Sequence, residues 1–321
     1  MCLNTLLNAQ NAAKRIKHKA QQFLSIKYFA DHKVGFIKTK EGVMQLIQWF
    51  PGHMTKAMRM MEEQVKLVDG IIYVLDARAP FACINAKLNA LFGTKPVVYV
   101  LNKSDLADEK GKRAALNSFE KDGKCAIAVN GTIKRDCGQV VEKMRFLLKD
   151  KIDRNAQKGV VKTVRVMVAG IPNTGKSTII NTISGGKKAQ TGNKAGVTKS
   201  KQWIRLDTFE MLDTPGTMPP SFENQTLAKY LAYIGSINDD ILDLQDLCLE
   251  LIKDLQNFYP GLLDEKYKID SNGKQPLEIY EDICLKRGYL LRGGEYDYDR
   301  CSKAVIDDFR HGKIGKVCFL K

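Results

Sequence analysis

Several features that would assign a chain to a class are missing from this sequence. It has no run of about 18 apolar residues, which excludes a membrane-spanning helix. Its eight cysteines form no C-x-x-C pair and have no histidine at metal-binding spacing. This scatter disfavours structural zinc and favours a reducing compartment. Acidic residues are also few, with 36 Asp and Glu against 51 Lys and Arg and none before Asp31.

The resulting net charge of +15 favours a polyanionic partner. For a chain without a membrane span we expect that partner to be RNA, and we expect neither DNA nor a membrane. A basic surface that serves only solubility would give the same charge. Composition therefore indicates RNA binding without deciding it.

Residues 170–177, Gly-Ile-Pro-Asn-Thr-Gly-Lys-Ser, fit the pattern G-x-x-x-x-G-K-[ST]. The apolar, β-branched run at 164–169 predicts a buried strand before them, and 178–183 predicts the opening of a helix. In this setting the backbone N–H groups and the helix N-terminus surround phosphate groups. The predicted phosphate contacts are Asn173, Thr174, Gly175, Lys176, Ser177 and Thr178.

Two of these residues have specific predicted roles, and two downstream residues, Asp213 and Gly216, join them. Lys176 reaches the outer phosphates and is a candidate catalytic residue, while the Ser177 hydroxyl binds Mg²⁺. Asp213 directly follows a predicted strand at 208–212 and supplies a carboxylate for Mg²⁺. In the same D-T-P-G sequence, the Gly216 N–H can sense the γ-phosphate.

The Gly196-Val197-Thr198 segment lies in a Gly-, Lys- and Thr-rich stretch without apolar periodicity, so we predict a loop. There we assign Thr198 as a mobile Mg²⁺ ligand with a catalytic role. An ordinary loop threonine is the alternative.

A guanine-reading pattern, Asn102-Lys103-Ser104-Asp105, follows a predicted strand at 97–101. Asp105 can accept hydrogen bonds from the ring N–H and the amino group of guanine. Adenine has neither donor at that edge and would leave a desolvated carboxylate unpaired, so we expect GTP as the nucleotide.

The neighbouring residues of this pattern have predicted supporting roles. Asn102 should tie the guanine loop to the phosphate loop, and the stem of Lys103 should cover a face of the base. A further strand at 125–129 leads to Asn130, whose backbone would contact the guanine carbonyl.

An ordinary GTPase has the phosphate loop first and the base reader last, whereas here the order is reversed. The sequence therefore predicts an α/β fold, a circularly permuted P-loop GTPase domain with a parallel sheet and helices on both faces. A polar segment at 151–162 would connect what are the two ends of an unpermuted domain.

The same pieces in the same order resemble the ribosome biogenesis GTPase A (RbgA or YlqF) family of circularly permuted GTPases. The resemblance extends from about Ile47 to the C-terminus. Its marks include the Trp49–Met54 segment with Lys56-Ala57, the Asp76–Pro80 segment, and the asparagine at 173. Further marks are Lys286–Gly288, Gly293-Gly294 and Gly312–Gly315.

The resemblance implies a role in late assembly of the large ribosomal subunit, with its precursor particle and rRNA as partners. It implies His53 as the catalytic residue that replaces the usual glutamine, because Thr217 occupies that position and is too short to orient water. A packed or RNA-facing His53 is the alternative. It also implies that Asn173 helps to bind K⁺, where a polar loop residue would be the simpler reading.

Three regions follow from these patterns: a basic extension at 1–43, the GTPase domain at 44–220, and a helical RNA- or ribosome-binding domain at 221–321. The extension is a mis-assigned start, a basic RNA-binding arm or a transit peptide. Helical spacing over 241–255, 277–287 and 301–310 predicts the C-terminal helices.

Two classes of function remain open at this point. The first is a slow GTPase, cytoplasmic or mitochondrial, triggered by a pre-ribosomal particle. The second is an RNA-binding placeholder that keeps GTP as a structural ligand. A GTPase of tRNA modification fits less well, since the order of its motifs is not permuted. We expect a monomer.

Overall fold

The computed structural model describes residues 36–39, 42–45, 47, 52–157, 163–186, 202–206, 209–218, 222 and 224–320. By its contacts the chain divides into two compact units, residues 1–48 and 49–321. In the first unit, β1 (Phe36–Thr39) and β2 (Gly42–Gln45) pair as an antiparallel hairpin. The proposed boundary at Val43 falls inside this hairpin.

The larger unit contains a six-stranded sheet in the order β5-β4-β3-β6-β8-β7. All neighbouring pairs are parallel except β7 and β8, so the sheet is mixed rather than fully parallel as predicted. The strands are β3 (Gly70–Asp76), β4 (Val97–Asn102), β5 (Cys125–Ala128), β6 (Val164–Ala169), β7 (Gln202–Arg205) and β8 (Phe209–Asp213).

The permutation is visible in this order, because β6 lies between β3, from the first half of the chain, and β8, from the second. Parallel strands present their carboxyl ends at one edge, where ligands bind in open α/β sheets. The guanine loop after β4 and the phosphate loop after β6 therefore reach the same edge of the sheet, although the chain presents them in reversed order.

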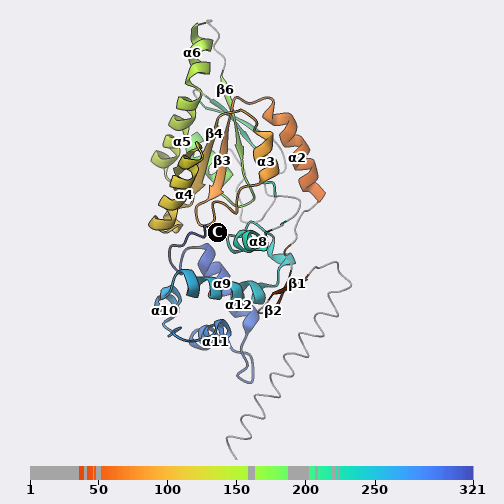
Figure 1. Ribbon diagram of the computed structural model, residues 1–321, viewed down its shortest axis with the longest axis vertical. Coiled ribbons are helices and arrows are strands. Elements are labelled where there is room, and N and C mark those ends of the chain that lie inside the picture. The colour runs from red at the N-terminus through yellow and green to blue at the C-terminus, as the bar shows by residue number, and fades with distance from the viewer. Residues whose placement is uncertain are drawn as a thin grey trace, which may run out of the picture. The chain divides into compact units, whose positions relative to one another are not determined.

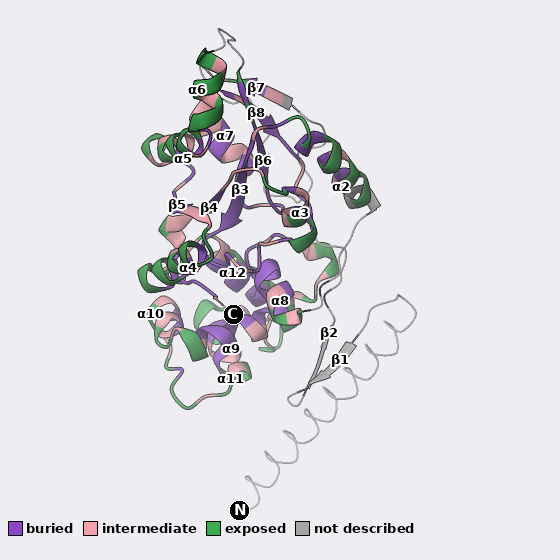
Figure 2. Cartoon of the chain, turned by 45° about the horizontal axis from the view of Figure 1, so that its top comes forward, coloured by how far each residue is buried: buried purple, intermediate pink, exposed green. Residues whose placement is uncertain are grey.

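Helices cover both faces of the sheet (Figure 1). On one face, Val74 and Val100 pack with residues of α5 and α7, such as Met144 and Ile179. On the other face, Tyr73 contacts Phe92 beyond the end of α3, at 5.2 Å between ring centroids. The central strands are buried along most of their length (Figure 2), as expected for strands covered on both faces. The helices around the sheet are α2 (Gly52–Val65), α3 (Ala86–Leu91), α4 (Glu109–Lys121), α5 (Lys134–Leu147), α6 (Lys149–Gln157) and α7 (Lys176–Ser184), with the 3₁₀ turn η2 (Ser104–Leu106).

The remaining helices form a bundle beyond the carboxyl edge of the sheet, and the C-terminal segment lies between the two (Figure 1). The amide of Val317 donates to the Leu106 carbonyl, which fixes this segment beside the guanine loop. The bundle contains α8 (Gln225–Tyr233), η3 (Asp239–Ile241), α9 (Leu244–Phe258), α10 (Leu262–Tyr267), α11 (Pro276–Arg287) and α12 (Tyr298–Arg310). The helices predicted near 241–255, 277–287 and 301–310 are thus confirmed as α9, α11 and α12.

Within the described residues, none of the helices is both long and apolar enough to cross a membrane.

Candidate nucleotide-binding site

The phosphate loop has the predicted setting, between β6 and α7. Lys176 is the first residue of α7, and Gly175 precedes it with a left-handed φ of 89°. A Cβ on Gly175 would overlap the Asn102 side-chain nitrogen, so both the backbone angle and the close approach require glycine here. Lys176, Ser177 and Thr178 occupy the first turn of α7, where N–H groups have no intrahelical partners.

The guanine loop and the phosphate loop are joined by Asn102, the last residue of β4. Its Nδ2 donates to the Thr174 carbonyl at 2.8 Å, and its Oδ1 accepts from the Gly131 amide at 2.8 Å. Asn102 is 2% exposed, so these hydrogen bonds form away from water and fix both loops. The predicted contact between Asn102 and the phosphate loop is confirmed.

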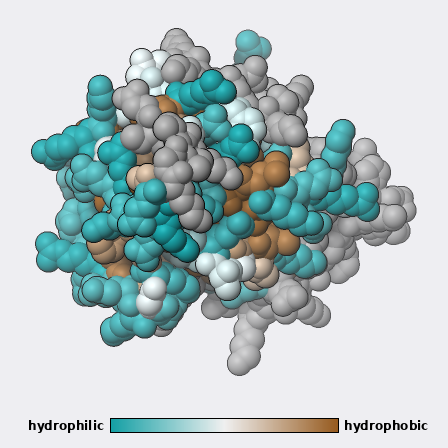
Figure 3. All heavy atoms as spheres, turned by 90° about the horizontal axis from the view of Figure 1, so that it is seen from above, coloured by the Kyte–Doolittle hydropathy of each residue, from teal (hydrophilic) through white to brown (hydrophobic). Residues whose placement is uncertain are grey.

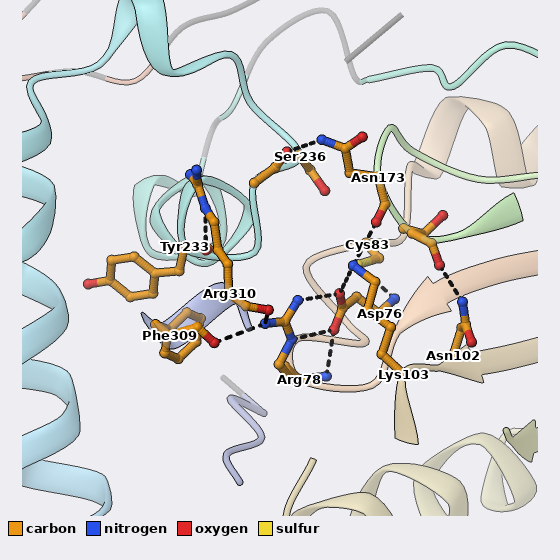
Figure 4. A network of polar contacts seen from close by, with 12 residues as sticks. Asp76, Arg78, Cys83, Asn102, Lys103, Asn173, Tyr233, Ser236, Phe309 and Arg310 are labelled. Carbon is orange, nitrogen blue, oxygen red and sulfur yellow. Dashed lines mark hydrogen bonds and ion pairs between the residues drawn. The ribbon is translucent and has the colours of Figure 1, made fainter. Parts of the chain in front are cut away.

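Lys103 makes a second connection between the two loops. Its Nζ donates to the Asn173 carbonyl at 2.8 Å and lies 3.0 Å from Asp76 Oδ2 (Figure 4). The next residues, Ser104 and Asp105, begin η2, and the Asp105 side chain is exposed. An exposed carboxylate at this edge is open to a ligand, as a base-reading residue must be.

Lys176 is buried in the phosphate loop, where its Nζ donates to the Ile171 carbonyl at 2.8 Å. Burial lowers the pKa of the Lys176 ammonium to about 8, although the nearby Asp213 carboxylate opposes this shift. Desolvation disfavours the charged form. A ligand with negative phosphates beside Lys176 would supply the missing counter-charge.

Two of the residues predicted to hold Mg²⁺, Ser177 and Asp213, lie together at the start of α7 and the end of β8. Ser177 Oγ donates to Asp213 Oδ2 at 3.2 Å. Asp213 is 1% exposed, and its Oδ1 has no hydrogen-bond partner among the residues that the structure describes. Burial raises the pKa of the Asp213 carboxyl despite the Lys176 charge. A hydroxyl and a buried carboxylate oxygen without a partner are hard ligands that suit Mg²⁺.

The D-T-P-G turn packs directly on the phosphate loop. A Cβ on Gly216 would lie 2.6 Å from Pro172 N, so only glycine allows this approach. Thr217 is fully buried, and its amide donates to the Gly170 carbonyl at 3.3 Å. Within the described part of the chain, the Thr217 hydroxyl also has no hydrogen-bond partner. The short, buried Thr217 side chain is held in the turn.

For three further residues predicted to lie in the site, Asn130, His53 and Thr198, the structure gives less information. Asn130 follows β5, its amide donates to Asp136 Oδ2, and its own Oδ1 accepts from Thr132. His53 falls in the first turn of α2, but its side chain lies outside the described residues, as does Thr198 altogether.

The helical bundle contacts the phosphate loop, which the sequence patterns did not predict. Asn173 Nδ2 donates to the Gly235 carbonyl at 2.5 Å, and Ser236 Oγ donates to the Pro172 carbonyl at 2.8 Å. Both contacts come from the loop that follows α8 (Figure 4). No local signal marks such pairs, which are separated by more than 60 residues in the chain.

Comparison with known proteins agrees with this geometry. A family model described as 50S ribosome-binding GTPase matches residues 165–278. The chain is 38% identical to ribosome biogenesis GTPase A of Bacillus cereus over 276 residues, which cover 85% of this chain and 93% of that protein. It is 33% identical to the Thermotoga maritima protein of the same name, with 85% and 94% covered. Mitochondrial ribosome-associated GTPase 1 of Ictalurus punctatus is 31% identical over 302 residues, with 86% and 93% covered.

Solved structures show the same relationship. The chain is similar to a GDP-bound YlqF structure with a TM-score of 0.58 and 28% identity, over 82% of this chain and 99% of the other. The GNP-bound YlqF of T. maritima gives a TM-score of 0.56 at 30% identity, over 82% and 97%.

Proposed function

The chain belongs to the ribosome biogenesis GTPase A family and is a GTP hydrolase, and we propose that it acts in late assembly of the large (50S) ribosomal subunit. In this proposal it binds the precursor particle and its rRNA, hydrolyses GTP when the particle stimulates it, and works as a cytoplasmic monomer. The Bacillus cereus relative is more similar to this chain than the mitochondrial relative of Ictalurus punctatus, at 38% against 31% identity, so mitoribosome assembly is the second candidate.

The observation that carries the proposal is the contact between Asn102 and Thr174, which joins a base-reading loop to a phosphate loop. A site that holds a base and phosphates at the same time reads a whole nucleotide. We assign guanine recognition to the loop that contains Asp105. The other predicted nucleotide contacts are Asn102, Lys103, Ser104, Asn130, Asn173, Thr174, Gly175, Lys176, Ser177, Thr178 and Gly216.

Mg²⁺ accompanies GTP in such a site, and the buried oxygen of Asp213 supports its place beside Ser177. When bound, the ion neutralises charge on the β- and γ-phosphates. Thr198 completes the ligand set in our proposal. In the same proposal, Lys176 binds the outer phosphates, and the backbone N–H of Gly216 donates a hydrogen bond to the γ-phosphate.

The charge of the chain agrees with a polyanionic partner. The 51 Lys and Arg against 36 Asp and Glu give a net charge of +15, and the face in Figure 3 is mainly hydrophilic with a few hydrophobic patches. Phosphate groups of RNA would attract such a surface over a range of about 10 Å at moderate salt.

The main test is stimulation by the particle. Because position 217 holds threonine instead of the glutamine that orients water in many GTPases, the free protein should hydrolyse GTP slowly, at ~10⁻⁴ s⁻¹, as an unassisted small GTPase does. Large-subunit particles should raise this rate at least about tenfold, which corresponds to roughly 1.4 kcal/mol of transition-state stabilisation. Turnover is measured by phosphate release with and without purified particles, and small-subunit particles are the control. Equal rates in all three samples would refute the triggered reaction and favour the placeholder function.

A second prediction concerns the monovalent cation. We propose that Asn173 helps to bind K⁺, which would offset negative charge on the phosphates. Turnover should then be faster in K⁺ than in Na⁺, because the two ions differ in size, and Asn173→Ala should abolish the difference. The measurement is turnover in matched chloride salts at one ionic strength.

The control for this experiment is Ser236→Ala. It removes the neighbouring contact between the helical bundle and Pro172 without changing Asn173. If Ser236→Ala also abolished the K⁺ preference, the cause would be the position of the bundle. Identical rates of the unaltered protein in both salts would remove K⁺ from the site.

A further inference from the structure

A buried ion pair at the carboxyl end of β3 lies outside the set of predicted nucleotide contacts. Asp76 ends the strand, and Arg78 folds back on it with Nε 2.9 Å from Oδ1 and Nη2 2.8 Å from Oδ2. Asp76 is fully buried and Arg78 is 1% exposed. A buried pair of this kind is costly to desolvate unless its other polar atoms are also satisfied, so its remaining partners show what it does.

On one side, the pair holds the guanine loop. Asp76 Oδ2 is shared between Arg78 and Lys103, whose Nζ lies 3.0 Å away. Lys103 has a left-handed backbone with φ of 57°, a conformation that persists in a non-glycine residue when its surroundings impose it. Asp76 and the Asn173 carbonyl together provide such a constraint, because both bind the Lys103 ammonium.

On the other side, the pair holds the helical bundle. Arg78 Nη1 donates to the carbonyls of Phe309 and Arg310, at 3.3 and 3.0 Å. These are the last residues of α12, where carbonyls lack intrahelical partners and the helix dipole is negative. The Arg78 carbonyl in turn accepts from the Phe319 amide at 2.6 Å.

The charges explain why these contacts depend on one another. One carboxylate serves two cations, the buried Arg78 and the partly exposed Lys103, which leaves an excess of one positive charge around Asp76. The negative end of α12 offsets this charge (Figure 4). Burial would raise the pKa of the Asp76 carboxyl, but Arg78 and Lys103 outweigh it and hold that pKa far below its ordinary value. Separation of α12 would remove both carbonyl acceptors of Arg78 Nη1 and the negative helix end beside it, and loss of order in Lys103 would remove one partner of Asp76.

We propose that Asp76 and Arg78 are positioning residues that couple guanine-nucleotide binding at Lys103 to docking of α12 and the C-terminal segment. The proposal rests on the proposed function, since it requires a guanine nucleotide beside Lys103. Asp76 sets the position of the Lys103 stem against the base, and Arg78 passes the constraint to Phe309 and Arg310. Such coupling is reciprocal. Docking of the bundle therefore strengthens nucleotide binding by the factor by which nucleotide binding favours docking.

The test compares the full chain with its Arg78→Lys variant, which keeps the charge but cannot make the forked contacts. In the unaltered chain, saturating GDP should slow hydrogen exchange of the amides at residues 305–320 by about fivefold or more, the lower end of typical coupling. In Arg78→Lys most of this slowing should disappear. The affinity of Arg78→Lys for a fluorescent GDP analogue should fall by up to the factor by which GDP slows exchange in the unaltered chain.

The matched control is Asp254→Asn. Asp254 forms a buried ion pair with Lys229 at 2.9 Å between α8 and α9, so its loss also destabilises the bundle. It should leave both the GDP affinity and the GDP-dependent slowing within about twofold of the unaltered chain, as expected for a site outside the coupled contacts. A variant that merely lowers stability would behave like this control.

Two results would overturn the coupling: equal GDP-dependent slowing in Arg78→Lys and the unaltered chain, or GDP binding to the unaltered chain without any slowing at 305–320. The second result decides the matter even if Arg78→Lys does not fold. Failure of the unaltered chain to bind GDP would instead refute the proposed function, and this coupling with it.

Discussion

Asp105→Asn should change the preference of this protein from guanine to xanthine nucleotides. A carboxylate accepts from two guanine donors, whereas the amide of Asn donates where xanthine carries a carbonyl. Sites that hydrogen-bond a substrate group reject an analogue without it by about 10⁴–10⁵-fold. Because Asp105 is exposed in η2, where water weakens each hydrogen bond, we expect a swing in relative affinity of about 10²–10⁴-fold. Competition of GDP and xanthosine diphosphate against a fluorescent nucleotide measures it.

Asp122→Asn is the control for this change. Asp122 is an exposed aspartate that caps the far end of α4 and pairs with Lys124, so its loss removes one negative charge from the same part of the fold. The control should keep the preference for GDP. An unchanged preference in Asp105→Asn would show that another residue reads the base, while the phosphate site would stand.

Local patterns were sufficient for the parts of the fold that carry the nucleotide loops. The strand predicted at 164–169 is β6 without any shift, since its β-branched residues are followed at once by the glycine loop. Strand β8 ends one residue later than predicted and includes Asp213. Apolar periodicity and glycine positions define these elements within a few residues.

Patterns were insufficient where an element has no apolar face. The connecting segment predicted at 151–162 begins as helix α6, Lys149–Gln157, which has no buried residue. Its residues favour a helix intrinsically, but without apolar periodicity they read as a charged connection. Strand β7 is four residues long and lies at the edge of the sheet, antiparallel to β8. Such a short segment does not show the alternation that identifies a strand.

The contacts with the helical bundle were beyond any sequence pattern for a different reason. Arg78 and Phe309 are 231 residues apart, and only the folded chain brings them together. The Asp76–Pro80 segment is a mark of the family, yet its sequence does not indicate that the Asp76 carboxylate forms ion pairs with both Arg78 and Lys103. Local sequence specifies the loops that bind nucleotide, while the partners of those loops depend on how the halves of the chain pack.

His53→Ala should slow GTP hydrolysis by the roughly 10²–10⁴-fold that follows loss of an acid–base or water-positioning group, with GTP affinity nearly unchanged. Thr217 stands where many GTPases have glutamine, and it is fully buried with its amide bonded to Gly170. It therefore cannot orient the attacking water. We propose that His53, in the first turn of α2, takes that role. Single-turnover hydrolysis on the free protein, beside a binding titration, measures both quantities.

His311→Ala is the matched control, because His311 is an exposed histidine at the end of α12 that interacts with Asp307. It should leave the single-turnover rate within about twofold, as expected for a surface change. If His53 instead packs against neighbours or faces RNA, its loss should lower thermal stability or particle binding and spare the rate. An undiminished rate constant in His53→Ala would defeat the catalytic assignment and leave the GTP site intact, because Asn102 and Lys103 supply the hydrogen bonds described between the guanine and phosphate loops.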